Sequence, residues 1–315
     1  ALGRDGRLLP LGANGARIPS RTCRAIHTMN ARHDYAGPFS GLTRPVLSAG
    51  HTDIAYIADA AACFTEDPHR APNIAVHAQA AHLLSLAERS FARAGLSVRT
   101  GWEDDMMELA PGELGVWLDE RGESAALGDE RGALNEAERQ LMQAWVALER
   151  GERELLLPVS ATRAIADLAG RYGAKAIYAA GEPAEWMNEL ADRHPEQFAL
   201  MFDGIRLALS ALSELVRAGL TLESWRHSMP LVYRRSRSVE VPASETGRVL
   251  SAFAGAEKDA AVGGGVRFER EDGWGWVCPD EQRPAFHIVT ESTSAEFARE
   301  LCDFCERELR RLAGT

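Results

Sequence analysis

The chain has 315 residues, 45% of them hydrophobic and 26% charged, so it is long enough to bury the cores of two or three compact units. Its formal net charge of −11 is offset by no basic tract, which disfavours general binding to nucleic acids or anionic membranes. The apolar runs are far shorter than the roughly 20 residues of a membrane span, and the opening residues ALGRDGRLLPLG lack the apolar core of a signal peptide. Five scattered cysteines predict reduced thiols in a cytoplasmic protein.

The first half of the chain predicts two helices followed by an α/β unit. Residues 20–34 form the first expected helix, with Ser20 as its N-cap, and residues 51–67 the second. An apolar strand, an amphipathic helix that ends at Gly95 and another strand come next. The pattern of strand, turn, strand, turn and long helix then fills residues 114–151.

The second half predicts another α/β unit and then a different arrangement. The expected elements of the α/β unit are the strands 153–160 and 174–180 and the helices 161–173 and 204–219, with Ser160 as a helix cap. Both units read as strand–helix–strand, which predicts parallel or mixed sheets flanked by helices. From about Ser228 the pattern changes to antiparallel strands with helices, an α+β unit. A charged turn between Pro279 and Pro284 joins two of its strands.

A C-x-x-C motif lies near the end of the chain. Cys302 and Cys305 occur in a strongly helical segment, where this spacing places them on one face with Phe297 and Leu301. No second pair of cysteines or histidines lies nearby in the sequence, so the motif favours buried helix packing over metal or redox chemistry.

Three segments in a fixed order resemble the α-D-phosphohexomutase family of phosphomannomutases and phosphoglucomutases. Residues 157–178 (LPVSATRAIADLAGRYGAKAIY) look like the opening of the third domain of that family, and the D-G-I of residues 203–205 resembles the start of the helix after its sugar loop. Residues 272–304 resemble the turn, strand and closing helix of its fourth domain. The likeness is greatest to the degenerate mutase-like C-terminal region that some bacterial mannose-1-phosphate guanylyltransferases carry.

The resemblance implies an α/β fold with two consecutive βαβ-type mutase-like domains followed by an α+β C-terminal domain. The expected ranges are the remnant of a truncated first domain at 1–45, the second domain at 46–150, the third at 151–228 and the fourth at 229–315.

The metal loop of the family, D-x-D-G-D-R, aligns with residues 119–124. Asp119 matches its first aspartate and Glu123 replaces its third, so these two are the candidate Mg²⁺ ligands. Arg121 replaces the second aspartate and places a guanidinium inside the expected ligand cage. The pattern therefore favours a charged turn between two strands over a metal site.

The phosphate loop of the family aligns with the turn after Cys278. That loop uses Arg, Ser, Gly and Thr to surround a phosphate dianion, whereas this chain has Cys278, Asp280, Glu281 and Gln282 at the same places. Two carboxylates there repel a phosphate. The candidate phosphate- or sugar-binding residues are Gln282, Arg283 and His287.

The phosphoserine motif and the sugar loop of the family have no counterpart in this sequence, and the mutase reaction needs the phosphoserine to donate and reclaim phosphate. We therefore expect a non-catalytic binding or regulatory module of nucleotide-sugar metabolism, of GDP-mannose type, that needs no cofactor. The expected partners are a sugar phosphate, a nucleotidyltransferase domain or a second copy of the chain. The alternative is an active phosphomannomutase or phosphoglucomutase with divergent loops, which would use Mg²⁺.

Overall fold

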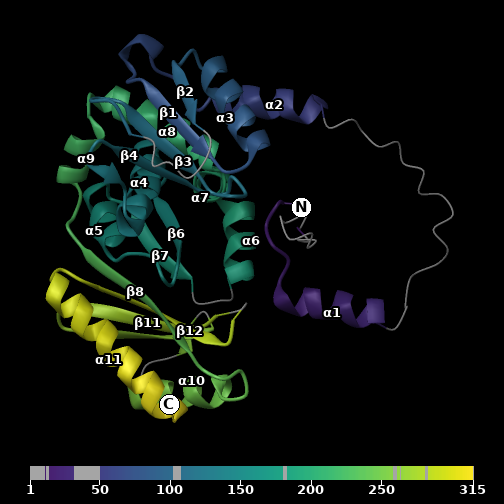
Figure 1. Cartoon of the computed structure of the whole chain (residues 1–315), viewed down its shortest axis with the longest axis vertical. Coiled ribbons are helices and arrows are strands. Elements are labelled where there is room, and N and C mark those ends of the chain that lie inside the picture. Colours follow the sequence, from purple (N-terminus) through teal and green to yellow (C-terminus); the bar gives the residue numbers. More distant parts are fainter. Residues whose placement is uncertain are drawn as a thin grey trace. The chain divides into compact units, whose positions relative to one another are not determined.

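The computed structural model describes residue 11 and residues 14–31, 50–101, 108–179, 183–257, 261–262, 264–280 and 283–314 (Figure 1). The chain divides into two compact units. The first unit combines Ala1–Leu134 with Met187–Arg226, and the second combines Asn135–Trp186 with His227–Thr315. The domain ranges expected from the sequence stay a prediction.

The first unit is built on a five-stranded sheet with the order β2-β1-β3-β4-β5. β1 pairs in parallel with both of its neighbours, and the remaining pairs are antiparallel. The strands are β1 (Ile74–Ala78), β2 (Val98–Gly101), β3 (Leu114–Leu118), β4 (Ala125–Asp129) and β5 (Gly132–Ala133). β1 is buried at four of its five positions, as expected for a central strand that is covered on both faces.

Helix α8 (Gly204–Ala218) is buried along most of its length. It packs against β3 and β4, and buried residues occur on all of its faces. The other helices of the unit are α1 (Ser20–Ala31), α2 (Gly50–Ala61), the 3₁₀ turn η1 (Pro68–Arg70), α3 (Ala81–Arg93) and α7 (Pro195–Phe202). Two helices cross the limits of the unit, α6 (Pro183–Arg193) and α9 (Leu222–Ser228).

The second unit contains one parallel strand pair and one antiparallel sheet. β6 and β7 pair in parallel around α5, and the five-stranded sheet has the order β8-β12-β11-β10-β9. The elements are α4 (Glu136–Glu149), β6 (Glu154–Pro158), α5 (Ala164–Arg171), β7 (Lys175–Ala179), β8 (Tyr233–Glu240), α10 (Thr246–Glu257), β9 (Ala261–Val262), β10 (Gly265–Arg270), β11 (Gly273–Pro279), β12 (Ala285–Ser292) and α11 (Ala295–Ala313). The expected change from parallel to antiparallel pairing is confirmed, and with it the α/β fold class.

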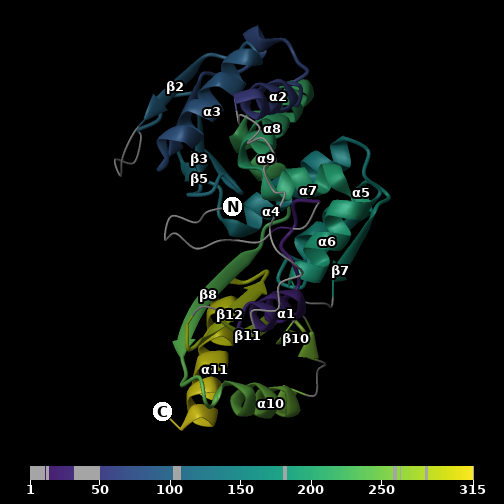
Figure 2. The same ribbon diagram turned by 90° about the vertical axis from the view of Figure 1, so that its right-hand side faces the viewer.

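Helices α10 and α11 lie against the antiparallel sheet and enclose its core (Figure 2). Cys302 and Cys305 are both buried in this core, so the C-x-x-C motif packs inside the helix interface as predicted. No helix within the described ranges has the length and apolar character needed to cross a membrane.

The cap expected for α5 was wrong. The helix begins at Ala164, and Ser160 lies too far before it to cap it. The N–H of Arg163 instead donates to Glu291 Oε1 at 2.9 Å, and the N–H of Ala164 donates to Thr162 Oγ1 at 3.3 Å. A carboxylate from a distant strand and the hydroxyl of Thr162, rather than Ser160, therefore accept the N–H groups at the start of this helix.

An ion pair at the edge of the first sheet predicts a pH effect. Arg99 of β2 donates to Glu113, just before β3, and this guanidinium holds the pKa of Glu113 below its ordinary value. The pair then stabilises the fold above the unfolded pKa of about 4.3, and the stabilisation is lost as pH falls through the lower folded pKa. We expect Glu113→Gln to cost about 1 kcal/mol at pH 7 and progressively less below about pH 4, measured by urea unfolding. A cost that does not change with pH would contradict this.

Candidate functional site

The loop that aligns with the family's metal loop is closed by its first residue. Asp119 follows β3, and its two carboxylate oxygens accept four hydrogen bonds from within the loop. Oδ1 accepts the N–H groups of Arg121 at 3.0 Å and Glu123 at 2.9 Å. Oδ2 accepts the N–H of Ser124 at 3.1 Å and its hydroxyl at 2.8 Å. A cation at this carboxylate would have to displace those donors.

The second candidate metal ligand faces cations. Glu123 Oε2 lies 3.4 Å from Arg17 Nη2, and Glu123 Oε1 lies 4.0 Å from Arg121 Nη1. Within the described ranges no three His, Cys, Asp or Glu side chains gather in a metal-binding group. The residues at 119–124 therefore do not fit a divalent cation, because their carboxylates already serve N–H donors and guanidinium groups.

The same loop is fastened to the start of α8. The N–H of Gly204 donates to Gly122 O at 2.9 Å, and a Cβ at Gly204 would lie only 2.6 Å from the backbone of Ser124. Only glycine allows so close an approach. The D-G-I motif singled out in the sequence thus has a structural role, since its glycine is the contact surface between loop and helix.

Asp203, the first residue of that motif, caps α8. Its Oδ1 accepts the N–H of Arg206 at 3.0 Å and the hydroxyl of Tyr56 at 2.7 Å. Burial raises the pKa of Asp203, although these hydrogen bonds act in the opposite direction. Burial also raises the pKa of Tyr56 above its ordinary value, with the nearby Asp203 adding to the effect. The contact ties α2 to the N-terminus of α8.

The charged turn of the second unit is a closed hairpin connection between β11 and β12. The N–H of Asp280 donates to Ala285 O at 2.8 Å, and the N–H of Arg283 donates to Asp280 Oδ1 at 3.2 Å. The Arg283 side chain is 73% exposed, and its Nε lies 3.4 Å from Asp280 Oδ2. Arg283 is therefore paired with a carboxylate of its own turn. Glu281 and Gln282 lie outside the described residues.

His287 stands on the face of β12 opposite the core. Phe286 and Ile288 on either side are fully buried, whereas His287 is half-buried and its Nε2 lies 3.2 Å from Ser236 Oγ. This arrangement follows from the alternation of side chains between the two faces of a strand. His287 and Arg283 belong to one hairpin but contact different partners, so within the described part of the turn they do not converge on one point.

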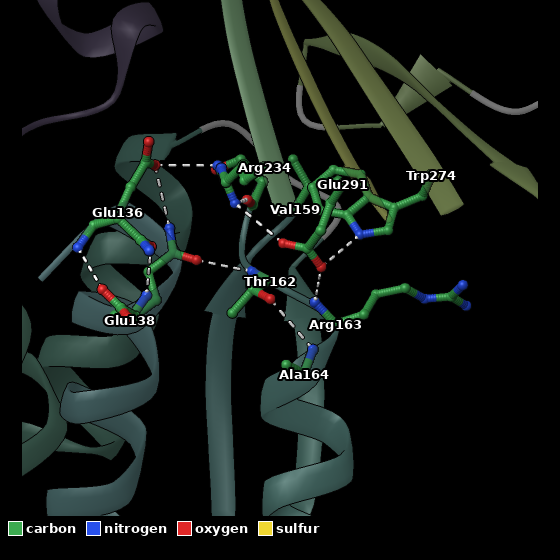
Figure 3. A network of polar contacts seen from close by, with 12 residues as sticks. Glu136, Glu138, Val159, Thr162, Arg163, Ala164, Arg234, Trp274 and Glu291 are labelled. Carbon is green, nitrogen blue, oxygen red and sulfur yellow. Dashed lines mark hydrogen bonds and ion pairs between the residues drawn. The ribbon is translucent and has the colours of Figure 1, made fainter. Parts of the chain in front are cut away.

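A polar network that the sequence did not reveal surrounds Glu291 in the second unit (Figure 3). Glu291 is 2% exposed, and its Oε1 accepts the indole N–H of Trp274 at 3.0 Å as well as the N–H of Arg163. Arg234 Nη1 lies 3.9 Å from Glu291 Oε2. A buried carboxylate thus holds the start of α5, a strand of the sheet and a guanidinium together.

Arg234 extends this network to two other segments. Its Nη1 donates to Ser160 O at 2.8 Å, and its Nη2 donates to Glu136 Oε1 at 3.1 Å. Burial lowers the pKa of Arg234 from its ordinary value, while Glu136 and Glu291 act to raise it. The signal that could have identified this group was a pair of opposite charges, since Arg234 near the start of β8 lies opposite Glu291 near the end of β12 in the antiparallel register.

No protein-family model matches the sequence, and no curated protein matches it. Solved structures do. A phosphoglucomutase/phosphomannomutase family protein from Burkholderia thailandensis is similar with a TM-score of 0.70 and 15% identity, over 95% of this chain and 71% of that protein. A protein described as a phosphomannomutase from Thermus thermophilus gives 0.60 and 14%, over 96% and 74%.

N-acetylphosphoglucosamine mutase from Aspergillus fumigatus, solved with GlcNAc-6P and magnesium, gives a TM-score of 0.57 and 11% identity, over 83% of this chain and 66% of that enzyme. The TM-scores show that the fold is similar, but at identities of 11–15% this similarity gives no information about the chemistry. The chemistry has to be argued from the residues of this chain. The chain therefore has a fold similar to that of phosphoglucomutase/phosphomannomutase proteins, a phosphohexomutase-like fold.

Proposed function

We propose that this chain is a non-catalytic, phosphohexomutase-like module of the cytoplasm. It has a binding or regulatory role in nucleotide-sugar metabolism of the GDP-mannose type. One observation carries the proposal. At the position of the metal loop, both oxygens of Asp119 accept hydrogen bonds from the loop itself, and Glu123 faces guanidinium groups. The fold supports the phosphohexomutase-like part of the proposal, and this loop supports the part that says the chain is not catalytic.

The turn of the second unit supports the same proposal. Arg283 is the cation that would have to receive a phosphate, and it is paired with Asp280. An incoming dianion would compete with that carboxylate and meet its negative charge. The partners that fit the proposal are a weakly bound sugar phosphate, a nucleotidyltransferase domain like the one fused to the degenerate mutase-like regions, or a second copy of the chain.

The test is an activity assay combined with thermal unfolding. The purified chain, given Mg²⁺ and a hexose 1,6-bisphosphate activator, should not interconvert the 1- and 6-phosphates of mannose or glucose. Millimolar Mg²⁺ should give the same melting temperature as NaCl at equal ionic strength. A cation that bound the native state alone would raise the melting temperature, so an unchanged value indicates that the chain has no Mg²⁺ site.

Asp119→Ala is the matched variant for this test. It should lower stability by about 1 kcal/mol, because four donors of the loop lose their acceptor and turn to water, and it should do so equally with and without Mg²⁺. Turnover that co-purifies with the chain, or a Mg²⁺-dependent rise in melting temperature that Asp119→Ala abolishes, would establish instead an active mutase with divergent loops.

A further inference from the structure

A cavity of about 470 Å³ lies in the first unit, at the edge of the sheet where β3 begins. Its walls come from the segment after η1, the turn between β4 and β5, the C-terminal end of α8 and the turn between α8 and α9. Small-molecule sites in proteins have volumes of about 300–1,000 Å³, so the cavity has the size of a ligand site.

The floor of the cavity is aliphatic. Leu114, Leu212, Leu215 and Leu222 line it, and each of these side chains is at most 5% exposed. Leu114 begins β3, Leu212 and Leu215 belong to α8, and Leu222 begins α9, and all four are buried in these elements. A ligand that fills this space must therefore have an apolar body.

Most of the charges around the cavity neutralise one another. Three of its four acidic residues lie next to an arginine, in the pairs Glu113–Arg99, Asp129–Arg226 and Glu223–Arg131. Such pairs leave little net attraction for a ligand of either charge.

Two charged residues of the rim contact backbone groups and form no ion pair within the described part of the chain. Arg70 donates to a backbone carbonyl, Val216 O at 3.3 Å, and has no carboxylate partner among the residues that the structure describes. Glu130 accepts a backbone N–H, that of Gly112 at 3.1 Å, and has no cationic partner in the same described part of the chain. The rim thus presents one positive and one negative group above an apolar floor.

We propose that this cavity is a binding site for a small zwitterion with an apolar body, of the class of apolar amino acids and short apolar peptides. The carboxylate of the ligand pairs with Arg70, its ammonium group pairs with Glu130, and its side chain covers the leucines of the floor. A sugar phosphate does not fit, because it has no apolar body and its dianion would meet Glu130. A simple amine would leave Arg70 without a partner.

The site is separate from the loop at residues 119–124. That loop follows β3, whereas the cavity lies where β3 begins, and the four residue steps along the strand span roughly 13 Å. Binding in the cavity therefore does not depend on the function proposed above.

The experiment is calorimetric titration of the full chain with two probes, L-tryptophan and the dipeptide Leu-Leu, which place the two charges at different separations. At least one probe should bind with a Kd below about 1 mM. Removing one charge of that probe, by N-acetylation or by amidation of the carboxylate, should weaken binding at least about tenfold. Glycine, a zwitterion without an apolar body, should give no binding.

Two variants assign the charges. Arg70→Gln should bind the amidated and the free probe equally, and Glu130→Gln should bind the acetylated and the free probe equally. The matched controls are Arg93→Gln and Glu88→Gln on α3, which are exposed and do not line the cavity, and both should bind like the unmodified chain. The proposal is overturned if neither probe binds, or if the Kd of the bound probe is the same in Arg70→Gln, in Glu130→Gln and in the unmodified chain.

Discussion

Replacing Glu291 by leucine should lower the free energy of unfolding by about 3–5 kcal/mol. The carboxylate is buried, and its removal leaves the indole N–H of Trp274 and the N–H of Arg163 without an acceptor. It also leaves Arg234, whose side chain is 7% exposed, with one carboxylate in place of two. The melting temperature should fall by roughly 10 °C, measured by circular dichroism.

Two variants show which part of Glu291 matters. Glu291→Gln keeps an oxygen for Trp274 and Arg163 and removes only the charge, so it should cost about 1–3 kcal/mol. Glu296→Gln, on an exposed residue of α11 paired with Arg299 at 3.9 Å, should cost less than about 0.5 kcal/mol. If the free energy of unfolding of Glu291→Leu is within about 1 kcal/mol of that of the unmodified chain, the polar network contributes no more to stability than apolar packing does.

Local patterns in the sequence predicted the elements well. The apolar runs at β1 and β6, the αL glycine that follows α3 and the alternation of Phe286, His287 and Ile288 all depend on neighbours within a few residues. The helix interface of Cys302 and Cys305 follows from a spacing of three. Such features can be predicted from the sequence because they depend only on interactions between residues that are close together in the chain.

The contacts that connect distant segments could not be predicted in this way. The start of α5 depends on Glu291, which lies 128 residues away in sequence from its partner Arg163. The cavity is formed by Arg70, Glu130 and leucines of α8, which share no pattern that a sequence window could detect. Asp119 is an intermediate case, because an aspartate three residues before a glycine is a known turn signal that predicts a closed loop.

Gly204→Ala should destabilise the first unit by about 1–3 kcal/mol, although alanine is the better helix former. The added Cβ would lie 2.6 Å from the carbonyl carbon and oxygen of Ser124 and 2.9 Å from Leu118 Cδ2. The first two of these atoms belong to a backbone that cannot rotate away, so the loop must move or the start of α8 must shift. Either change also strains the hydrogen bond from Gly204 N–H to Gly122 O.

Gly170→Ala is the matched control, because it makes the same chemical change inside another helix. Gly170 is an exposed residue of α5, and a Cβ there would meet nothing within 4 Å. The substitution should stabilise the protein by up to about 1 kcal/mol, since alanine loses less backbone entropy than glycine in a helix. Chemical unfolding of the two variants should therefore give changes of opposite sign. Stabilisation by both would mean that the loop at 119–124 does not rest on the N-terminus of α8, and the close contact at Gly204 would then be no constraint on this fold.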